Sequence, residues 1–171
     1  MNTSNLGIAL IKEFESFSPK PYLCPAGKLT IGYGHLIKAG ETFTSLTEEE
    51  ALLLLKKDVE IAENAVKTIA GCSFNQYMFD ALVSFCFNLG GGALERSTLL
   101  SYLKIGRLKD AAKEFEKWNK AGGQVLQGLV IRRKTEKILF EAGRLEAKNG
   151  NGKPYPLKNN RSKAKFGAKR R

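Results

Sequence analysis

The chain has 171 residues, 43% of them hydrophobic and 26% charged, which is the composition of an ordinary globular protein of one domain with a sizeable core. A net charge of +11 is high for this length and predicts contact with a polyanion: nucleic acid, an anionic membrane surface or an acidic cell envelope. The odd count of three cysteines argues against a disulfide framework, and no uncharged apolar run reaches the roughly 18 residues of a transmembrane helix.

The sequence before residue 46 predicts one helix and one small sheet. Residues 5–16 have apolar side chains at helical spacing and are followed by prolines, so a helix is expected there. Residues 22–45 are rich in glycine and contain two short β-prone runs, 29–31 and 42–44. This pattern is typical of a small antiparallel sheet.

A long helix is expected over residues 47–70. Thr47 and Glu50 form a capping-box pattern, and Leu46 is placed to pack across the start of the helix. An apolar stripe at helical spacing follows, and a helix of this length can join two lobes. The stripe consists of Ala51, Leu55, Val59, Ala62, Val66 and Ile69.

The remaining body, residues 71–143, is predicted to be helical. A second possible capping box, Ser73 and Gln76, predicts one helix start, and Ser97 predicts a short helix that ends at Gly106. Further along the chain we expect a helix over 108–118, a flexible loop over 121–128 and a helix over 129–142 that is closed by Gly143.

Residues 144–171 carry most of the net charge. They hold ten Lys or Arg against one acid, a charge of +9, which leaves residues 1–143 with only +2. Their low apolar periodicity predicts a tail that is disordered or only partly helical in isolation. Its two aromatic residues, Tyr155 and Phe166, are too few for base stacking, which argues against nucleic acid as the partner. An anionic envelope or lipid surface is the expected partner, and a solubilising extension is the alternative.

The residues available for chemistry are mainly carboxylates. The chain has one histidine and no Cys-x-x-Cys pair, and it lacks P-loop, G-x-G-x-x-G and G-x-S-x-G motifs, so we expect neither a metal nor another cofactor. Cleavage of a glycosidic bond needs one carboxylic acid to protonate the leaving oxygen. It also needs a second group to activate water or to stabilise the developing cation.

Glu15 is the candidate for the acid. It follows Ile11 by one turn at the end of the first predicted helix, where apolar neighbours would favour the protonated form. Glu13 lies about 200° around the helix from Glu15 and is expected in solvent. By position alone, however, a surface charge is the simpler interpretation of Glu15.

The segment IKEFESFSPKPYLCPAGKLTIGYGH contains the spacing Glu15-x8-Cys24-x5-Thr30, which resembles the active-site region of phage-type lysozymes. The resemblance extends over about residues 5–143. The later blocks that are similar to this family are NQYMFDALVSFCFNLGGGALERSTLL (75–100), Glu114-x3-Trp118 and GL-x2-RR-x2-E-x2-LF (128–140).

The resemblance implies an α+β, mostly α fold with two lobes and a substrate cleft between them. Residues 1–46 would form the lobe with the small antiparallel sheet, and residues 47–70 the connecting helix. Residues 71–143 would form the helical lobe, and residues 144–171 would be a basic tail outside the lysozyme domain.

The resemblance also implies roles for three residues. Glu15 matches the general acid, and Thr30 matches the residue that helps to hold the attacking water. Cys24 stands where many members have Asp. Because a thiol is mostly neutral at neutral pH, Cys24 would stabilise a cationic transition state less than Asp does. It would orient water with Thr30, act as a nucleophile, or only pack.

Other residues are candidates for binding or for structure. Tyr22, Gly32 and Arg132 are expected to contact substrate, with Gly34 shaping the cleft and Arg133, Asn88 and Gln76 as weaker candidates. His35 is expected to form an ion pair with Asp58, which would tie the sheet to the long helix. Cys72 and Cys86 are expected in the core.

The function that the resemblance implies is that of an endolysin, a muramidase that lyses the host cell. It would hydrolyse the β-1,4 bond between N-acetylmuramic acid and N-acetylglucosamine in peptidoglycan. A lytic transglycosylase that uses Glu15 alone and a non-enzymatic envelope-binding protein remain as alternatives. The first residues lack the pattern of a signal peptide, so we expect synthesis in the host cytoplasm and action on the wall from the periplasm. A separate membrane-permeabilising protein would then be needed, and a monomer is expected.

Overall fold

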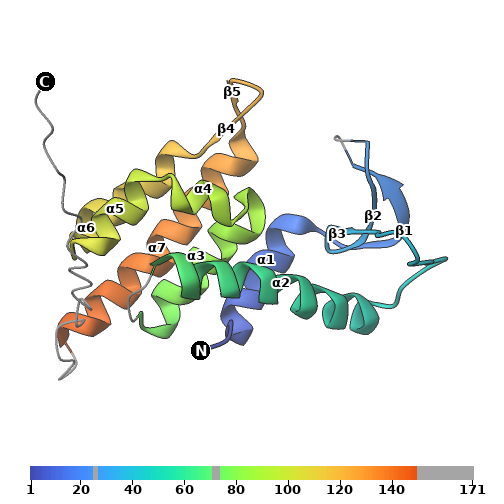
Figure 1. Ribbon diagram of the computed structural model, residues 1–171, viewed down its shortest axis with the longest axis horizontal. Coiled ribbons are helices and arrows are strands. Elements are labelled where there is room, and N and C mark those ends of the chain that lie inside the picture. The colour runs from blue at the N-terminus through green and yellow to red at the C-terminus, as the bar shows by residue number, and fades with distance from the viewer. Residues whose placement is uncertain (25–26, 71–73, 150–171) are drawn as a thin grey trace, which may run out of the picture.

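The structure, a computed structural model, describes residues 1–24, 27–70 and 74–149. It has a small lobe with a three-stranded sheet and a larger helical lobe, and the long helix α2 (Glu48–Ala70) extends between them (Figure 1). The mostly helical α+β arrangement expected from the sequence is confirmed.

The first helix, α1 (Asn5–Glu15), lies close to the predicted range. It begins at Ser4, whose side-chain oxygen accepts a hydrogen bond from the Gly7 backbone NH. It ends at Ser16, whose positive φ of 57° turns the chain toward the sheet. Ile11 is fully buried, so α1 is held in place by the helical lobe against which it packs.

The predicted sheet is present, with antiparallel strands in the order β1-β2-β3. The strand expected at 42–44 was wrong. Those residues are irregular and follow a turn at residues 38–41, in which the Glu41 side chain accepts a hydrogen bond from the Lys38 backbone NH. The strands are β1 (Ser18–Leu23), β2 (Leu29–Gly32) and β3 (His35–Leu36).

Helix α2 confirms the prediction for 47–70. The Thr47 hydroxyl accepts a hydrogen bond from the Glu50 backbone NH at 3.2 Å, and the Glu50 carboxylate accepts one from the Thr47 NH at 2.8 Å. The apolar stripe faces the core, and five of its residues are buried: Ala51, Leu55, Val59, Ala62 and Val66.

The helical lobe is built around α3, whose residues 78–86 are all buried. The N-cap of α3 is Asn75, whose side chain accepts a hydrogen bond from the Met78 NH, so the start predicted from Ser73 was wrong. Ser73 itself lies outside the described residues. Ser97 caps α5 as expected. The remaining elements are α3 (Gln76–Leu89), α4 (Gly91–Glu95), α5 (Thr98–Lys104), α6 (Leu108–Glu114), the 3-10 turn η1 (Phe115–Lys117) and α7 (Gln127–Asn149).

Two further predictions in this lobe were wrong. The expected loop at 121–128 contains a hairpin of β4 (Lys120–Ala121) and β5 (Gln124–Val125), because Gly122 and Gly123 both take the positive φ of a tight turn. Gly143 does not end the last helix. Helix α7 continues through it to Asn149 and packs against α3.

Gly143 is a close-packing residue in the middle of α7. A Cβ atom at this position would lie 2.8 Å from the Met78 Cγ atom, and the Gly143 carbonyl accepts a hydrogen bond from the Asn75 side chain. Glycine therefore occurs here because α3 comes too close for a side chain. None of the helices in the part of the chain described is long and apolar enough to cross a membrane.

Candidate active site

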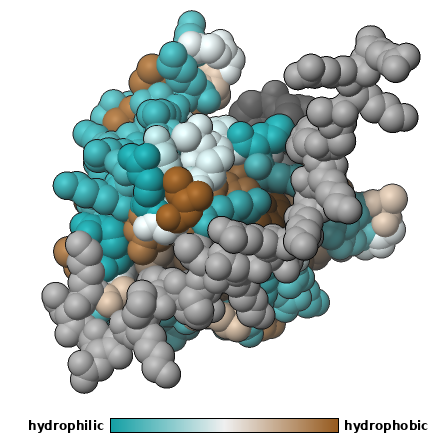
Figure 2. All heavy atoms as spheres, turned by 60° about the vertical axis from the view of Figure 1, so that its left-hand side comes forward, coloured by the Kyte–Doolittle hydropathy of each residue, from teal (hydrophilic) through white to brown (hydrophobic). Residues whose placement is uncertain are grey.

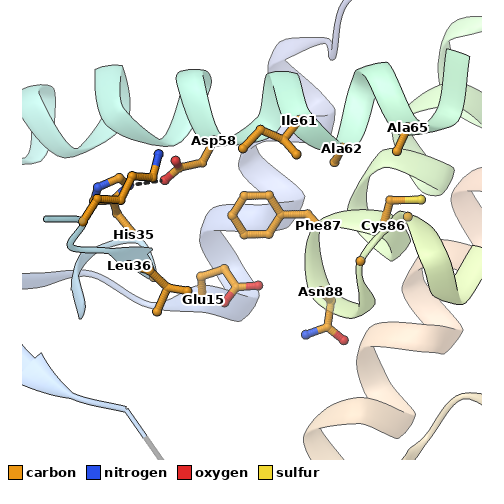
Figure 3. Close-up of a pocket in the computed structure, with 14 residues that line it drawn as sticks. Glu15, His35, Leu36, Asp58, Ile61, Ala62, Ala65, Cys86, Phe87 and Asn88 are labelled. Atoms are coloured by element: carbon orange, nitrogen blue, oxygen red, sulfur yellow. Dashed lines mark hydrogen bonds and ion pairs between the residues drawn. The ribbon is translucent and has the colours of Figure 1, made fainter. Parts of the chain in front are cut away.

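Glu15 is the last residue of α1 and lies where the two lobes meet. Its side chain is 21% exposed and lines a pocket of about 370 Å³ between β3, α2 and the C-terminal end of α3 (Figure 3). Gly34 covers one side of the carboxylate, since a Cβ atom there would lie 3.4 Å from the Glu15 Oε2 atom. Apolar side chains from α2 and α3, Ile61 and Phe87, complete the wall. The predicted acid is thus partly desolvated and still accessible from the pocket.

Arg132 of α7 is the direct partner of Glu15. Its Nη1 atom donates a hydrogen bond of 2.6 Å to Glu15 Oε1, and its Nη2 atom donates one of 3.3 Å to the Ser84 carbonyl. The guanidinium lies 5.4 Å from the centre of the Phe14 ring and is only 3% exposed. The sequence proposed Arg132 for substrate binding, whereas the structure places it outside the lining of the pocket, in contact with the candidate acid.

Glu136, which sequence reasoning missed, lies behind Arg132. Its Oε1 atom accepts hydrogen bonds from the Ser84 hydroxyl at 2.7 Å and from Arg132 Nε at 3.3 Å. Arg133 Nη1 lies 3.2 Å from the other carboxylate oxygen. The spacing R-R-x-x-E places these three charges on one side of a helix, which was the available signal.

Burial changes the titration of this cluster. It raises the pKa of Glu136, and the neighbouring Arg133 and Arg132 guanidinium groups oppose that rise. Burial also lowers the pKa of Arg133 to about 10. Arg133 nevertheless remains charged at neutral pH.

Tyr22, Cys24 and Thr30 lie together on the hairpin of β1 and β2. Tyr22 is the register partner of Thr30, and the Cys24 NH donates a hydrogen bond of 2.9 Å to the Lys28 carbonyl. The Thr30 hydroxyl, which is buried, donates a hydrogen bond of 3.0 Å to the same carbonyl. None of these three residues lines the pocket next to Glu15. The structure therefore brings them together with one another but outside that pocket.

Two of the predicted glycines have different surroundings. Gly32 has a φ of 64°, and a Cβ atom there would lie 3.2 Å from the Ala51 Cβ atom, so the sheet packs closely on α2 at this point. Gly34 faces Glu15, as described above. Gln76 lies at the start of α3, where it donates hydrogen bonds to the Asn2 carbonyl and to Asp80.

The predicted contact between His35 and Asp58 is present, with 2.8 Å between Nδ1 and Oδ2. The other ring nitrogen, Nε2, lies 3.0 Å from Glu41 Oε2, a partner that the sequence did not predict. The Lys38 backbone NH and His35 together lower the pKa of Glu41. This arrangement ties β3 to α2 at the edge of the pocket. Over residues 1–24, 27–70 and 74–149, no group of three or more His, Cys, Asp or Glu side chains could hold a metal ion.

Comparison with known proteins agrees with this architecture. A family model described as phage lysozyme matches residues 12–136. The endolysin of Bacillus phage B103 is 47% identical over 151 residues, which are 87% of this chain and 57% of that protein. The endolysin of Salmonella phage P22 is 36% identical over 144 residues, which are 82% of this chain and 98% of that protein. The chain thus spans little more than half of some relatives and nearly all of others.

A solved structure supports the same conclusion. The muramidase domain of SpmX from Asticaccaulis excentricus is 37% identical, with a TM-score of 0.74 over 81% of this chain and 97% of that one. The family model covers most of the chain, and a relative is matched over almost its full length. The chain therefore belongs to the phage lysozyme family.

Proposed function

We propose that this chain is an endolysin that hydrolyses the β-1,4 bond between N-acetylmuramic acid and N-acetylglucosamine in bacterial peptidoglycan, with Glu15 as the proton donor. The observation that carries the proposal is the position of Glu15, which is partly desolvated at the junction of the two lobes and open to a pocket of about 370 Å³. A general acid needs both partial burial and access to the leaving oxygen.

The two oxygens of Glu15 have different surroundings, which suits proton donation. Oε1 accepts a hydrogen bond from Arg132, whereas Oε2 is the oxygen next to Gly34, which also lines the pocket. A proton carried on Oε2 could pass to a glycosidic oxygen in the pocket, while Arg132 fixes the orientation of the carboxyl group.

Thr30 and Cys24 are proposed to hold the attacking water on the basis of the family spacing Glu15-x8-Cys24-x5-Thr30, although neither residue lines the pocket next to Glu15. The Thr30 hydroxyl donates its hydrogen to the Lys28 carbonyl, so its lone pairs can accept a hydrogen bond from water. Cys24 lies next to it in the same hairpin. Tyr22, the register partner of Thr30, would contact the glycan from this side.

One observation supports a second candidate, a lytic transglycosylase. Position 24 has a cysteine rather than a carboxylate, so electrostatic stabilisation from this side is weak. The muramic acid 6-hydroxyl would then replace water as the nucleophile, and Glu15 alone would carry the acid–base chemistry.

Product analysis separates the two reactions. Purified protein would be incubated with peptidoglycan, and the released fragments analysed by mass spectrometry. Hydrolysis leaves reducing ends, whereas transglycosylation leaves 1,6-anhydro ends. Glu15→Gln, whose amide cannot donate this proton, should lose at least about 90% of either activity while remaining folded. Greater residual activity would exclude Glu15 as the general acid.

The cellular setting belongs to the same proposal. The protein would act as a monomer on the periplasmic side of the wall, after a separate membrane-permeabilising protein has given it access. Residues 144–171, with a charge of +9, would bind anionic lipopolysaccharide or lipid. Cells that produce this chain without such a protein should lyse only when the inner membrane is permeabilised artificially.

A further inference from the structure

Glu136 is a fully buried carboxylate whose contacts all point toward the site. Its exposure is 0%, and it contacts the Ser84 hydroxyl and the guanidinium groups of Arg132 and Arg133. No proton transfer in the proposed reaction uses it. Its place in the core therefore needs another explanation.

Stability alone does not explain this cluster. A buried ion pair is a weak stabiliser, since well-packed apolar residues of similar volume are often as stable or more so. The contact between Arg133 Nη1 and Glu136 Oε2 is an ion pair without hydrogen-bond geometry. A cluster of this kind is more readily explained by a functional requirement.

The two arginines extend from Glu136 to two different groups of the pocket. Arg132 bonds to Glu15 at 2.6 Å, and Arg133 Nη2 donates a hydrogen bond of 2.8 Å to Asn88 Oδ1. Glu15 and Asn88 both line the pocket, as Figure 3 shows. One buried carboxylate thus contacts two arginines, and each arginine binds a different polar group of the same pocket.

The hydrogen bond from Arg133 also fixes which way the Asn88 amide points. A guanidinium can only donate hydrogen bonds, so the atom that it contacts must be the amide oxygen. The NH2 group of Asn88 is then left as a donor, and in Figure 3 it lies on the side of the amide nearer Glu15. Such a donor suits a carbonyl or hydroxyl oxygen of a glycan.

We propose that Glu136 is a positioning residue. It fixes the orientation of the Glu15 carboxyl group through Arg132 and that of the Asn88 amide through Arg133. The inference rests on the proposed glycan-cleaving function. It assigns Asn88 as a donor to a substrate oxygen, such as the carbonyl of an acetamido group. It also gives Glu136 a second effect, because Arg133 and Arg132 oppose the rise in its pKa that burial causes, and the ionised carboxylate offsets one of the two guanidinium charges near Glu15.

The test compares Glu136→Gln with Glu114→Gln. Glu114 is also a buried carboxylate of the helical lobe, but its ion-pair partner is the exposed Lys117, away from the pocket. With soluble uncrosslinked peptidoglycan strands as substrate, Glu136→Gln should lower kcat by about 10-fold or more and raise KM. Glu114→Gln should keep both near the wild-type values.

The pH profile distinguishes positioning from a general loss of stability. Without Glu136 the positive charge near Glu15 grows, so the alkaline limb of the activity profile should move to lower pH. The other titratable groups that line this pocket, His35, Lys38 and Asp58, are the same in both variants. A reduced folded fraction would lower the whole profile without moving this limb.

The proposed effect of Glu136 on Asn88 through Arg133 is tested by combining variants. Asn88→Ala alone should raise KM, and adding it to Glu136→Gln should raise KM no further, because both changes remove the same donor. Additive effects on KM would overturn this half of the proposal. If Glu136→Gln does not fold, Ser84→Ala, which removes one hydrogen bond to the carboxylate, should shift the alkaline limb in the same direction by a smaller amount.

The outcomes separate the two proposals. If the wild-type protein cleaves the strands and the folded variants at positions 136 and 84 match Glu114→Gln in kcat, KM and pH profile, then Glu136 has no positioning role. If the wild-type protein releases neither reducing nor anhydro ends, the proposed function itself fails.

Discussion

The side-chain amide of Asn75 donates a hydrogen bond of 2.7 Å to the carbonyl oxygen of Gly143, which joins the start of α3 to the middle of α7. The two helices are so close here that a Cβ atom at position 143 would lie 2.8 Å from Met78 Cγ. This contact helps to fix α7, and α7 carries the residues that hold Glu15.

We expect Gly143→Ala to destabilise the protein by about 1–3 kcal/mol, because the added methyl group overpacks the contact with α3. The matched control is Gly128→Ala in the same helix, where a Cβ atom would meet nothing within 4 Å. That change should be neutral or slightly stabilising, since Ala has the higher helix propensity. Urea denaturation of both variants measures the difference, and equal midpoints would contradict the close-packing role.

Glu63 is expected to contribute stability that is lost at acid pH. Burial raises the pKa of Glu63, but hydrogen bonds from the Thr3 NH and hydroxyl and from Lys67 outweigh this effect, so that its pKa lies below the usual value. A carboxylate whose pKa is lower in the folded than in the unfolded protein stabilises the fold at pH values above its unfolded-state pKa. That contribution disappears as the pH falls through its folded-state pKa.

Glu63→Gln should therefore have a free energy of unfolding about 1–2 kcal/mol lower than that of the wild type at pH 7. This difference in free energy should become smaller below about pH 4. Glu60→Gln, an exposed change on the same helix, should alter stability by less than about 0.5 kcal/mol at either pH. Thermal melts at several pH values provide the measurement. A stability difference between Glu63→Gln and wild type that does not depend on pH would show that the ionised form of Glu63 is not what stabilises the N-terminus.

Substitutions of Cys24 test whether the hairpin takes part in catalysis. Cys24→Asp should be active, because it places a carboxylate beside Thr30, where a negative charge can stabilise a cationic transition state. Cys24→Ala should lose about 10-fold in rate, more than Cys72→Ala or Cys86→Ala at equal folded fraction. Turbidity clearing of purified cell walls gives the rates. Equal rates for the three alanine variants would reduce Cys24 to a packing residue.

Removal of residues 150–171 should leave folding and the cutting of purified wall unchanged. Binding to anionic vesicles at low salt should weaken, since this segment contains eight Lys or Arg and no acid. The truncation is placed after Asn149, because α7 extends that far. A full-length variant with Gln in place of those eight residues is the control for charge, and it should bind as weakly as the truncated chain. Unchanged vesicle binding in both would favour the solubilising interpretation.

Local patterns predicted the elements whose signals lie within a few residues of one another. The capping box at Thr47 and the stripe from Ala51 gave the start and the buried face of α2, because both arise from contacts within one helix. The strand at 42–44 and the helix end at Gly143 were wrong for the opposite reason. At 42–44 the β-propensity suggested a strand, but the chain follows a turn at Glu41 instead. At Gly143 the glycine suggested a helix end, but it lies inside the helix because α3 approaches too closely for a side chain.

The sequence by itself determined the lobe order, the helical periodicity and the motif that contains Glu15, Cys24 and Thr30. The R-R-x-x-E spacing also puts Arg132, Arg133 and Glu136 on one side of a helix, as three- and four-residue spacings do in any α-helix, but this signal was not used to predict a role for Glu136. Only the tertiary structure decided that this side faces Glu15, which is 117 residues away from Arg132 in the chain. Packing of α7 against α3 brings these charges together in the core, and no local spacing encodes a contact across that distance.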